Sequence, residues 1–131
     1  MPAIEHHKTP NVLIIDDDED FLKLISPMLK QLGMFPIPMA GSLEAVAFFR
    51  QNHLIIDFVL MDYRLPVLDG CHVFTKLKSF DPEIKCILCT ASDSPEDYLE
   101  AMKLGMKAIL KKPFTLEDVT TAISLASKSE H

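Results

Sequence analysis

Carboxylate, hydroxyl and ammonium side chains come directly after short apolar segments of this 131-residue chain. Asp16 and Asp17 follow one such segment, Asp62 follows another, and Thr90 and Lys112 follow two more. Carboxylates that crowd together near neutral pH repel one another unless they share a proton or hold a cation. Mg²⁺ suits such a group because it is a hard cation that takes one or two carboxylates, keeps several waters and binds a phosphate oxygen. These residue types therefore indicate phosphoryl-group chemistry with Mg²⁺.

Asp62 is the carboxylate that this pattern leaves free to act as a nucleophile. An aspartate can attack a phosphoryl group to give an acyl phosphate. The ammonium group of Lys112 would neutralise the equatorial oxygens and the hydroxyl of Thr90 would donate a hydrogen bond, which is the positioning and electrostatic work that phosphoryl transfer requires. We therefore expect Asp62, Thr90 and Lys112 to carry the chemistry, beside a metal bound at the acidic residues.

Each of these features also has an ordinary structural explanation. The acidic run at 16–20 would cap a helix and match its positive dipole end. Asp62 and Thr90 would be loop or strand-end residues, and Lys111 with Lys112 would be solvated charges. The functional interpretation is favoured because all of these residues directly follow predicted strands, at one edge of the predicted sheet.

The apolar segments that precede these residues have the composition of buried β-strands. They span residues 12–15, 35–39, 58–61, 84–89 and 108–110. Segments with helical periodicity follow them, and strands that alternate with helices predict a parallel sheet covered on both faces, with right-handed crossovers. The sequence thus predicts a three-layer, doubly wound α/β domain with strand order 2-1-3-4-5. In such a sheet ligands bind beyond the carboxyl ends of the strands, where the strand order reverses.

Capping residues mark the expected helices. Ser42, Asp69, Ser94 and Thr115 are each expected to cap a helix at its N-terminus, and Pro27 to kink the first helix. The apolar stripe of the first helix, which Gly33 ends, comprises Phe21, Leu22, Leu24, Ile25, Met28, Leu29 and Leu32. The stripe of the last helix comprises Leu116, Val119, Ile123 and Leu125.

Prolines and cysteines place two further constraints on the sheet. Pro36 and Pro38 cannot donate to a β-ladder, so the second strand should lie at an edge. Cys86 and Cys89 have CxxC spacing, but side chains alternate faces along a strand. They should therefore point to opposite sides of the sheet and be buried thiols, as should Cys71, instead of sharing a metal or forming a disulfide.

Composition limits the class of protein. The length of 131 residues suits one domain, and 48% hydrophobic residues with four glycines and nine prolines exclude collagen-like and disordered chains. The net charge of −6 argues against nucleic acid as a partner. No apolar run approaches the roughly 20 residues that cross a bilayer, and the N-terminus lacks a signal-peptide core. We expect a cytoplasmic protein without membrane contact and with a loose extension at residues 1–10.

Four motifs, in order, closely resemble those of response-regulator receiver domains. They are Asp16-Asp17 after Val12–Ile15, the run from Met61-Asp62 to Asp69-Gly70, Thr90-Ala91, and Lys112-Pro113-Phe114. The resemblance spans residues 11 to about 127, and we expect the receiver domain to occupy residues 11–128. It implies a flavodoxin-like (βα)₅ domain that takes a phosphoryl group from a phosphohistidine of a sensor histidine kinase or a histidine phosphotransfer protein.

The resemblance also implies roles, position by position. Asp62 matches the phosphoacceptor and a metal ligand, Asp17 the direct Mg²⁺ ligand, and Asp16 the acid that holds Mg²⁺ through water. Arg64 matches the position whose backbone carbonyl binds the metal, and Lys112 the phosphate-contacting lysine. Thr90 matches the switch hydroxyl, Asp18 has no role beyond capping the first helix, and the Lys112-Pro113 peptide is expected to be cis.

The sequence departs from the family at one position. Three residues before the family lysine, an aromatic residue usually rotates inward on phosphorylation, whereas this chain has Ile109. A β-branched aliphatic side chain cannot signal by burying an aromatic ring. Arg64 and Ser92 match positions that tune how fast water removes the phosphoryl group, so replacing Arg64 should change the lifetime of the phosphorylated form.

The resemblance implies signalling by docking to an unknown downstream protein. Because the chain ends soon after the last helix, no effector domain is expected. The protein would be a relay intermediate, an adaptor or an excised receiver, monomeric or weakly dimeric when phosphorylated. Its chemistry would be self-phosphorylation and slow self-dephosphorylation, not that of an enzyme. Two alternatives stay open: a haloacid-dehalogenase-like phosphohydrolase, which would have an Asp where Arg64 stands, and a receiver that is never phosphorylated.

Overall fold

Five strands and five α-helices alternate in the computed structural model, which describes residues 9–128. The strands are β1 (Asn11–Ile15), β2 (Phe35–Met39), β3 (Phe58–Met61), β4 (Lys85–Thr90) and β5 (Ala108–Lys111). The helices are α1 (Glu19–Gln31), α2 (Ser42–Asn52), α3 (Gly70–Phe80), α4 (Pro95–Leu104) and α5 (Leu116–Ser127), with a short 3₁₀ helix, η2 (His53–Ile55), before β3. The predicted extension at residues 1–10 lies almost wholly outside the described residues.

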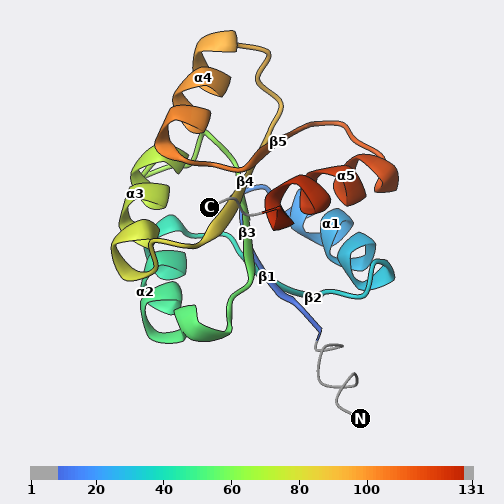
Figure 1. Ribbon diagram of the computed structural model, residues 1–131, viewed down its shortest axis with the longest axis horizontal. Helices are drawn as coiled ribbons and strands as arrows, with labels where there is room; N and C mark the ends of the chain where they lie inside the picture. Colours follow the sequence, from blue (N-terminus) through green and yellow to red (C-terminus); the bar gives the residue numbers. More distant parts are fainter. Residues whose placement is uncertain (1–8, 129–131) are drawn as a thin grey trace.

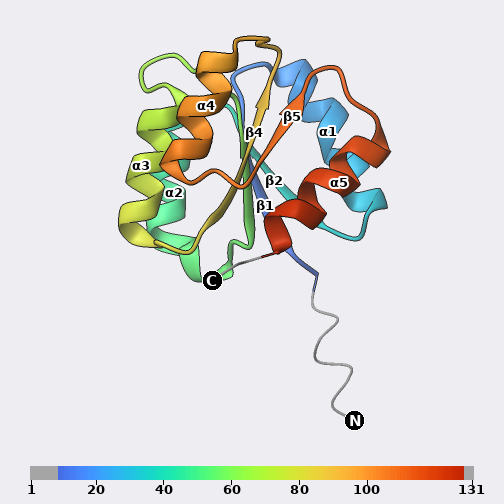
Figure 2. The same cartoon turned by 45° about the horizontal axis from the view of Figure 1, so that its top comes forward.

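The sheet is parallel and has the order β2-β1-β3-β4-β5, as predicted. Helices α1 and α5 cover one face, and α2, α3 and α4 cover the other (Figure 1). The turned view in Figure 2 shows the same three layers, with β4 and β5 in front of the other strands. The predicted doubly wound arrangement is therefore confirmed, and no helix among residues 9–128 is long and apolar enough to cross a membrane.

The edge position of β2 is confirmed, and it explains why two prolines are tolerated there. Pro36 pairs with Val12 and Pro38 with Ile14, so among the described strands β2 adjoins only β1. The prediction for the cysteines is confirmed as well. Cys86 belongs to the core on the α2, α3 and α4 side, whereas Cys89 belongs to the core beside α1 and α5. Burial raises the thiol pKa of both.

Most predicted helix starts are confirmed, and one is wrong. Asp69, Ser94 and Thr115 accept hydrogen bonds from backbone N–H groups of the first turns of α3, α4 and α5. Gly41, and not Ser42, precedes α2, and it provides no side-chain cap. Ser42 is the first helical residue, and its buried hydroxyl donates to the carbonyl of Pro66 at 3.3 Å. The serine thus connects α2 to the loop after β3 instead of capping its own helix.

The apolar stripes predicted for α1 and α5 are each wrong at one residue. Leu24 is 60% exposed and Leu125 is 50% exposed. In α5 the buried positions beside Val119 are Ala122 and Ala126, because small residues let this helix pack closely on the sheet. Helix α1 runs without interruption through Pro27, whose side chain is exposed. Asp18 caps α1 as expected, and the Lys112-Pro113 peptide is cis.

Candidate functional site

The candidate site is built at the carboxyl ends of four strands, and the strand register brings its residues together. Asp16 follows β1 and Asp62 follows β3, and the last residues of these strands, Ile15 and Met61, are paired. The ladder continues past the strands, since the Asp62 amide donates to the Ile15 carbonyl at 3.1 Å and the Lys112 amide to the Thr90 carbonyl at 2.8 Å. The backbone itself therefore fixes where these four side chains start.

Lys112 connects the two neighbouring carboxylates. Its Nζ donates to Asp16 Oδ2 at 2.7 Å and to Asp62 Oδ2 at 3.3 Å. The side chain of Asp16 is 1% exposed, whereas those of Lys112 and Asp62 are 18% and 17% exposed. A charged carboxylate buried as deeply as Asp16 requires a partner, and Lys112 supplies one. Asp62 keeps an edge that is accessible from solvent.

Burial and pairing act against each other on the pKa values of this cluster. Burial raises the pKa of Asp16 above its ordinary value, although hydrogen bonds from Lys112 and from the Asp18 amide lower it. Burial lowers the pKa of Lys112, but the hydrogen bond to Asp16 and the charges of Asp62 and Asp16 outweigh it, so the pKa ends above its ordinary value. Lys112 is therefore a permanent cation beside Asp62.

The sequence predicts that Asp16, Asp17 and Asp62 lie close together, and the structure places Asp16 and Asp62 in one cluster. Asp16 and Asp62 share Lys112, whereas Asp17 is exposed in the loop between β1 and α1. Within residues 9–128, no three His, Cys, Asp or Glu side chains are grouped so that they could hold a metal ion. The donor set nevertheless fits Mg²⁺ chemically, because it consists of carboxylate oxygens. Asp62 Oδ1 accepts a hydrogen bond from the Arg64 amide at 3.4 Å.

Thr90 is held at the end of β4 beside the acidic cluster. It is 2% exposed, and its Oγ1 accepts a hydrogen bond from the Ser92 amide at 3.1 Å. The Ser92 hydroxyl in turn donates to Asp97 Oδ2 at 2.8 Å, in the first turn of α4. Ile109, which stands where the resemblance led us to expect an aromatic residue, lies on β5 and packs against the core on the α2, α3 and α4 side. The structure thus connects Thr90 to α4 through Ser92.

The loop after β3 is tied to α4 by contacts that sequence reasoning missed. The Tyr63 hydroxyl donates to Glu100 Oε1 at 2.5 Å, which raises the pKa of Tyr63. The guanidinium of Arg64, which is 77% exposed, lies 3.8 Å from Asp97 Oδ2. The sequence signal for these pairs is limited to acidic residues in the segment that forms α4 and to a tyrosine and an arginine in the loop after β3.

Gly70 is required by close backbone approach in this loop. A Cβ at position 70 would lie 2.5 Å from the carbonyl oxygen of Asp62 and 3.1 Å from the Cα of Tyr63. The backbone bearing the predicted nucleophile therefore packs directly on the start of α3. Val67, in the same loop, has a φ of 64° and is 80% exposed. A β-branched residue is strained in that conformation, which is typical of loops at functional sites.

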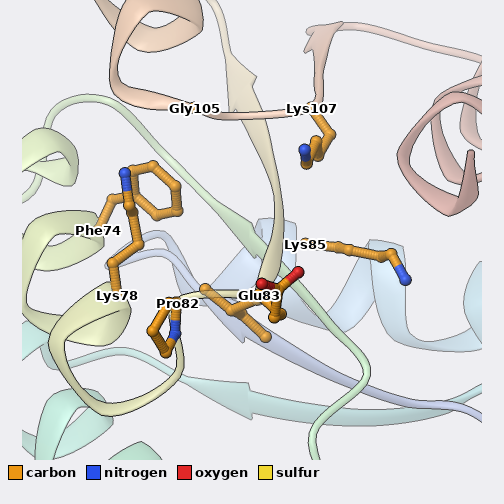
Figure 3. Close-up of a pocket in the computed structure, with 8 residues that line it drawn as sticks. Phe74, Lys78, Pro82, Glu83, Lys85, Gly105 and Lys107 are labelled. Carbon is orange, nitrogen blue, oxygen red and sulfur yellow. The ribbon is translucent and has the colours of Figure 1, made fainter. Parts of the chain in front are cut away.

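A cavity of about 230 Å³ lies at the amino end of the sheet, and none of the residues of the cluster lines it. Three lysines line it, together with Glu83 and the ring of Phe74; they are Lys78, Lys85 and Lys107. Figure 3 shows that Lys78 extends along Phe74 while Lys85 extends away on the other side of β4. Because the ammonium groups of Lys78 and Lys85 point apart and Glu83 lies between these two residues, the lysines of this cavity do not meet around one anion.

Comparisons with known proteins point to one family. The family model described as response regulator receiver domain matches residues 12–124. The autoinducer 1 sensor kinase/phosphatase LuxN of Vibrio campbellii is 32% identical over 111 residues, which are 85% of this chain and 13% of that protein. The chemotaxis protein CheY of Halobacterium salinarum is 30% identical over 113 residues, which are 86% of this chain and 92% of that protein.

Solved structures give the same answer for the fold. A response regulator receiver domain from Clostridium thermocellum superposes with a TM-score of 0.84 and 30% identity, covering 89% of this chain and 93% of that one. This likeness confirms the flavodoxin-like arrangement that the sequence motifs imply. The relatives differ widely in architecture, since the chain spans 13% of the length of LuxN but nearly all of CheY.

Proposed function

The chain belongs to the response-regulator receiver family, and on that basis we propose that it accepts a phosphoryl group on Asp62 from the phosphohistidine of a sensor histidine kinase or phosphotransfer protein. The observation that carries this proposal is the position of Lys112, whose ammonium group joins buried Asp16 to partly exposed Asp62. A lysine and a buried acid placed around one accessible carboxylate suit a nucleophile that becomes an acyl phosphate. Residues 11–128 form the proposed receiver unit.

The proposed transfer is a simple displacement at phosphorus. A carboxylate oxygen of Asp62 forms a bond to phosphorus while the bond from phosphorus to the donor's imidazole nitrogen breaks. The electron pair of that bond goes to the nitrogen, so a histidine with its other ring nitrogen protonated leaves as neutral imidazole. The products are an aspartyl phosphate and an unmodified histidine, and no further reactant is required.

Lys112 and Thr90 stabilise the group in transit. The Lys112 ammonium, already 3.3 Å from Asp62, neutralises charge on a phosphoryl oxygen as Asp62 gives up its own charge to the new bond. The Thr90 hydroxyl donates to a second oxygen, which draws it toward the phosphoryl group. Ser92, whose amide donates to Thr90 Oγ1, then changes its environment as well. This gives the loop before α4 a way to respond to phosphorylation.

Asp16, Asp17, Asp62 and the Arg64 carbonyl would hold Mg²⁺, with the direct ligands being Asp17, Asp62 and the carbonyl. Mg²⁺ would supply positive charge for the phosphoryl oxygens that Lys112 and Thr90 do not reach. Lys112 keeps Asp16 in place, while the exposed position of Asp17 leaves its oxygens accessible from solvent. A downstream protein would then recognise the face that phosphorylation rearranges.

The test is intact-mass spectrometry after incubation with acetyl phosphate and Mg²⁺. We expect the native chain to gain one phosphoryl group, and Asp62→Ala to gain none. A matched control is Asp81→Ala, which removes an aspartate at the far end of α3 and should leave phosphorylation unchanged. A chelator should prevent the gain. Phosphorylation of Asp62→Ala at the native rate would overturn the assignment of the phosphoacceptor.

A further inference from the structure

The ammonium group of Lys112 has an aromatic neighbour in addition to its two carboxylate partners. Its Nζ lies 4.1 Å from the centroid of the Phe21 ring. Phe21 is 7% exposed and belongs to α1, 91 positions earlier in the chain than Lys112 by their numbers. An ammonium group within about 6 Å of a ring face is attracted by the ring's negative π-surface. The ammonium group of Lys112 thus contacts both carboxylate oxygens and an aromatic ring.

Both the backbone and the ring of Phe21 are fixed by neighbours. Asp18, which caps α1, accepts a hydrogen bond from the Phe21 amide at 3.3 Å. The ring of Phe114 packs edge-on against the Phe21 ring, with centroids 5.9 Å apart and an angle of 86° between the planes. Phe114 comes two residues after Lys112, so the same loop supplies the lysine and a ring that orients its aromatic partner.

The surroundings of this contact are apolar. A groove of about 330 Å³ adjoins the site, and Lys112 is the only charged residue that lines it. Its other lining residues are Phe21, Leu24, Ala91, Pro113 and Phe114. The Lys112 side chain is only 18% exposed, so water competes less for its ammonium group, and the attraction of the ring is stronger than at an exposed site.

We propose that Phe21 is a positioning residue for phosphoryl transfer, whose ring face holds the ammonium group of Lys112 in place over Asp62. A lysine side chain has many rotamers, and confining it before the reaction removes an entropic cost from the transition state. The ring attracts the cation without forming a hydrogen bond, so the N–H groups stay free for Asp16, Asp62 and the incoming phosphoryl group. This inference rests on the proposed function of Asp62.

Phe21 is also part of the hydrophobic core between α1, α5 and the sheet, so a large-to-small substitution would confuse positioning with packing. Fluorinated phenylalanines avoid this confusion, because each fluorine withdraws charge from the ring face while the side chain keeps nearly the same shape. We would introduce 4-fluoro-, 3,5-difluoro- and 3,4,5-trifluorophenylalanine at position 21 and measure the rate constant of phosphorylation by acetyl phosphate with Mg²⁺.

The expected result is a stepwise fall of the rate constant with each fluorine, by about threefold to tenfold in all. The melting temperature should stay nearly constant through the series. A matched control exists at the other end of the sheet, where Lys78 Nζ lies 5.2 Å from the centroid of the Phe74 ring. The same substitutions at position 74 should leave the phosphorylation rate constant unchanged.

A second measurement reports the contact without any reaction. The ε-methylene protons of Lys112 should show an upfield NMR shift from the Phe21 ring current, and Phe21→Leu should abolish that shift. A rate constant that stays flat through the fluorine series, in a protein that does take up phosphate, would overturn the role of Phe21 and leave it a core residue. A native chain that gains no phosphoryl group would instead overturn the function of Asp62, and this proposal with it.

Discussion

Each end of the sheet holds a lysine whose ammonium group lies over a phenylalanine ring, and the two lysines have different partners on their other side. At the carboxyl end Lys112 lies over Phe21 and donates to Asp16 and Asp62. At the amino end Lys78 lies over Phe74 and donates to the backbone carbonyl of Leu104 at 2.7 Å. The same pairing of cation and ring therefore adjoins a pair of carboxylates in one place and a helix terminus in the other.

The direction of the helices explains this difference. In a right-handed βα unit the helix returns antiparallel to the strand, so helix C-termini, with their unpaired carbonyls and negative dipole end, gather at the amino end of the sheet. Leu104 is the last residue of α4, and Lys78 supplies a donor for its carbonyl. At the carboxyl end the negative groups are side chains after β1 and β3, so a lysine there faces carboxylates instead of backbone carbonyls.

Removing each lysine should separate the two roles, and this is the largest effect that we expect. Lys112→Met should lower the phosphorylation rate constant by about 100-fold, because a preorganised cation at the reacting group is lost. Lys78→Met should leave that rate constant unchanged and lower the free energy of unfolding by about 1 kcal/mol, because the Leu104 carbonyl loses its donor. Mass spectrometry and urea unfolding would measure the two quantities, and equal rates for the two variants would remove the distinction.

Two glycines allow a parallel comparison of the ends. Gly70→Ala places a Cβ 2.5 Å from the Asp62 carbonyl oxygen, a backbone atom, so we expect a loss of about 2 kcal/mol in the free energy of unfolding. Gly105, at the amino end, has a φ of 108° and its nearest neighbour is the flexible tip of Lys78. Gly105→Ala should cost only about 1 kcal/mol, through backbone strain. A greater loss in Gly105→Ala, measured by urea unfolding, would contradict this order.

The contact between Arg64 and α4 allows us to predict in which direction substitutions change the lifetime of the phosphorylated form. Arg64 is a long, exposed cation two residues after Asp62, and on our proposal it can pair with the phosphoryl group and shield it from water. Arg64→Ala should therefore speed the decay of the phosphorylated form by about threefold, the scale of one exposed ion pair. Asp97→Ala releases Arg64 from its partner and should slow that decay by a similar factor. Decay followed by mass spectrometry would reject the idea if both variants matched the native protein.

The position of the candidate site residues could be predicted from the sequence because it depends on backbone topology. Residues that directly follow strands in a parallel sheet must meet at one edge, and Asp16, Asp62, Thr90 and Lys112 do so. Caps such as Thr115 could be predicted as well, because they depend on local hydrogen bonding. What these residues do is still a prediction: phosphoryl transfer by Asp62, Thr90 and Lys112, and metal binding by Asp16, Asp17, Asp62 and Arg64.

The individual side-chain contacts could not be predicted in the same way. Periodicity indicates that Phe21 and Leu24 belong to one stripe, but not that the first ring lies under Lys112 while Leu24 stays 60% exposed. Those details depend on how closely α1 approaches the loop after β5. Likewise, Ala122 and Ala126 of α5 are buried because the helix lies close to the sheet. The apolar pattern of a sequence does not indicate how close a helix lies to the sheet.

Helix α3 joins the two ends, and its cap gives the smallest expected effect. Asp69 accepts a hydrogen bond from the His72 amide, which is the main reason that the pKa of this carboxyl lies below its ordinary value. A carboxyl whose pKa is depressed on folding stabilises the protein at pH values above its unfolded pKa, and that contribution is lost as the pH falls through the folded pKa. Asp69→Asn keeps a capping oxygen but removes the charge at the helix N-terminus.

The native protein should therefore be more stable than Asp69→Asn by about 0.5 kcal/mol at pH 7, since the carboxylate is largely exposed and screened by solvent. The difference should shrink below about pH 4, the ordinary range of an aspartate, and vanish once the native carboxyl is protonated. Urea unfolding of both proteins between pH 7 and pH 3 would measure it. A difference independent of pH would assign the effect to packing of the α3 terminus. A difference that follows the titration would show that charge at this helix start stabilises α3, the helix that joins the loop after β3 to the far end of the sheet.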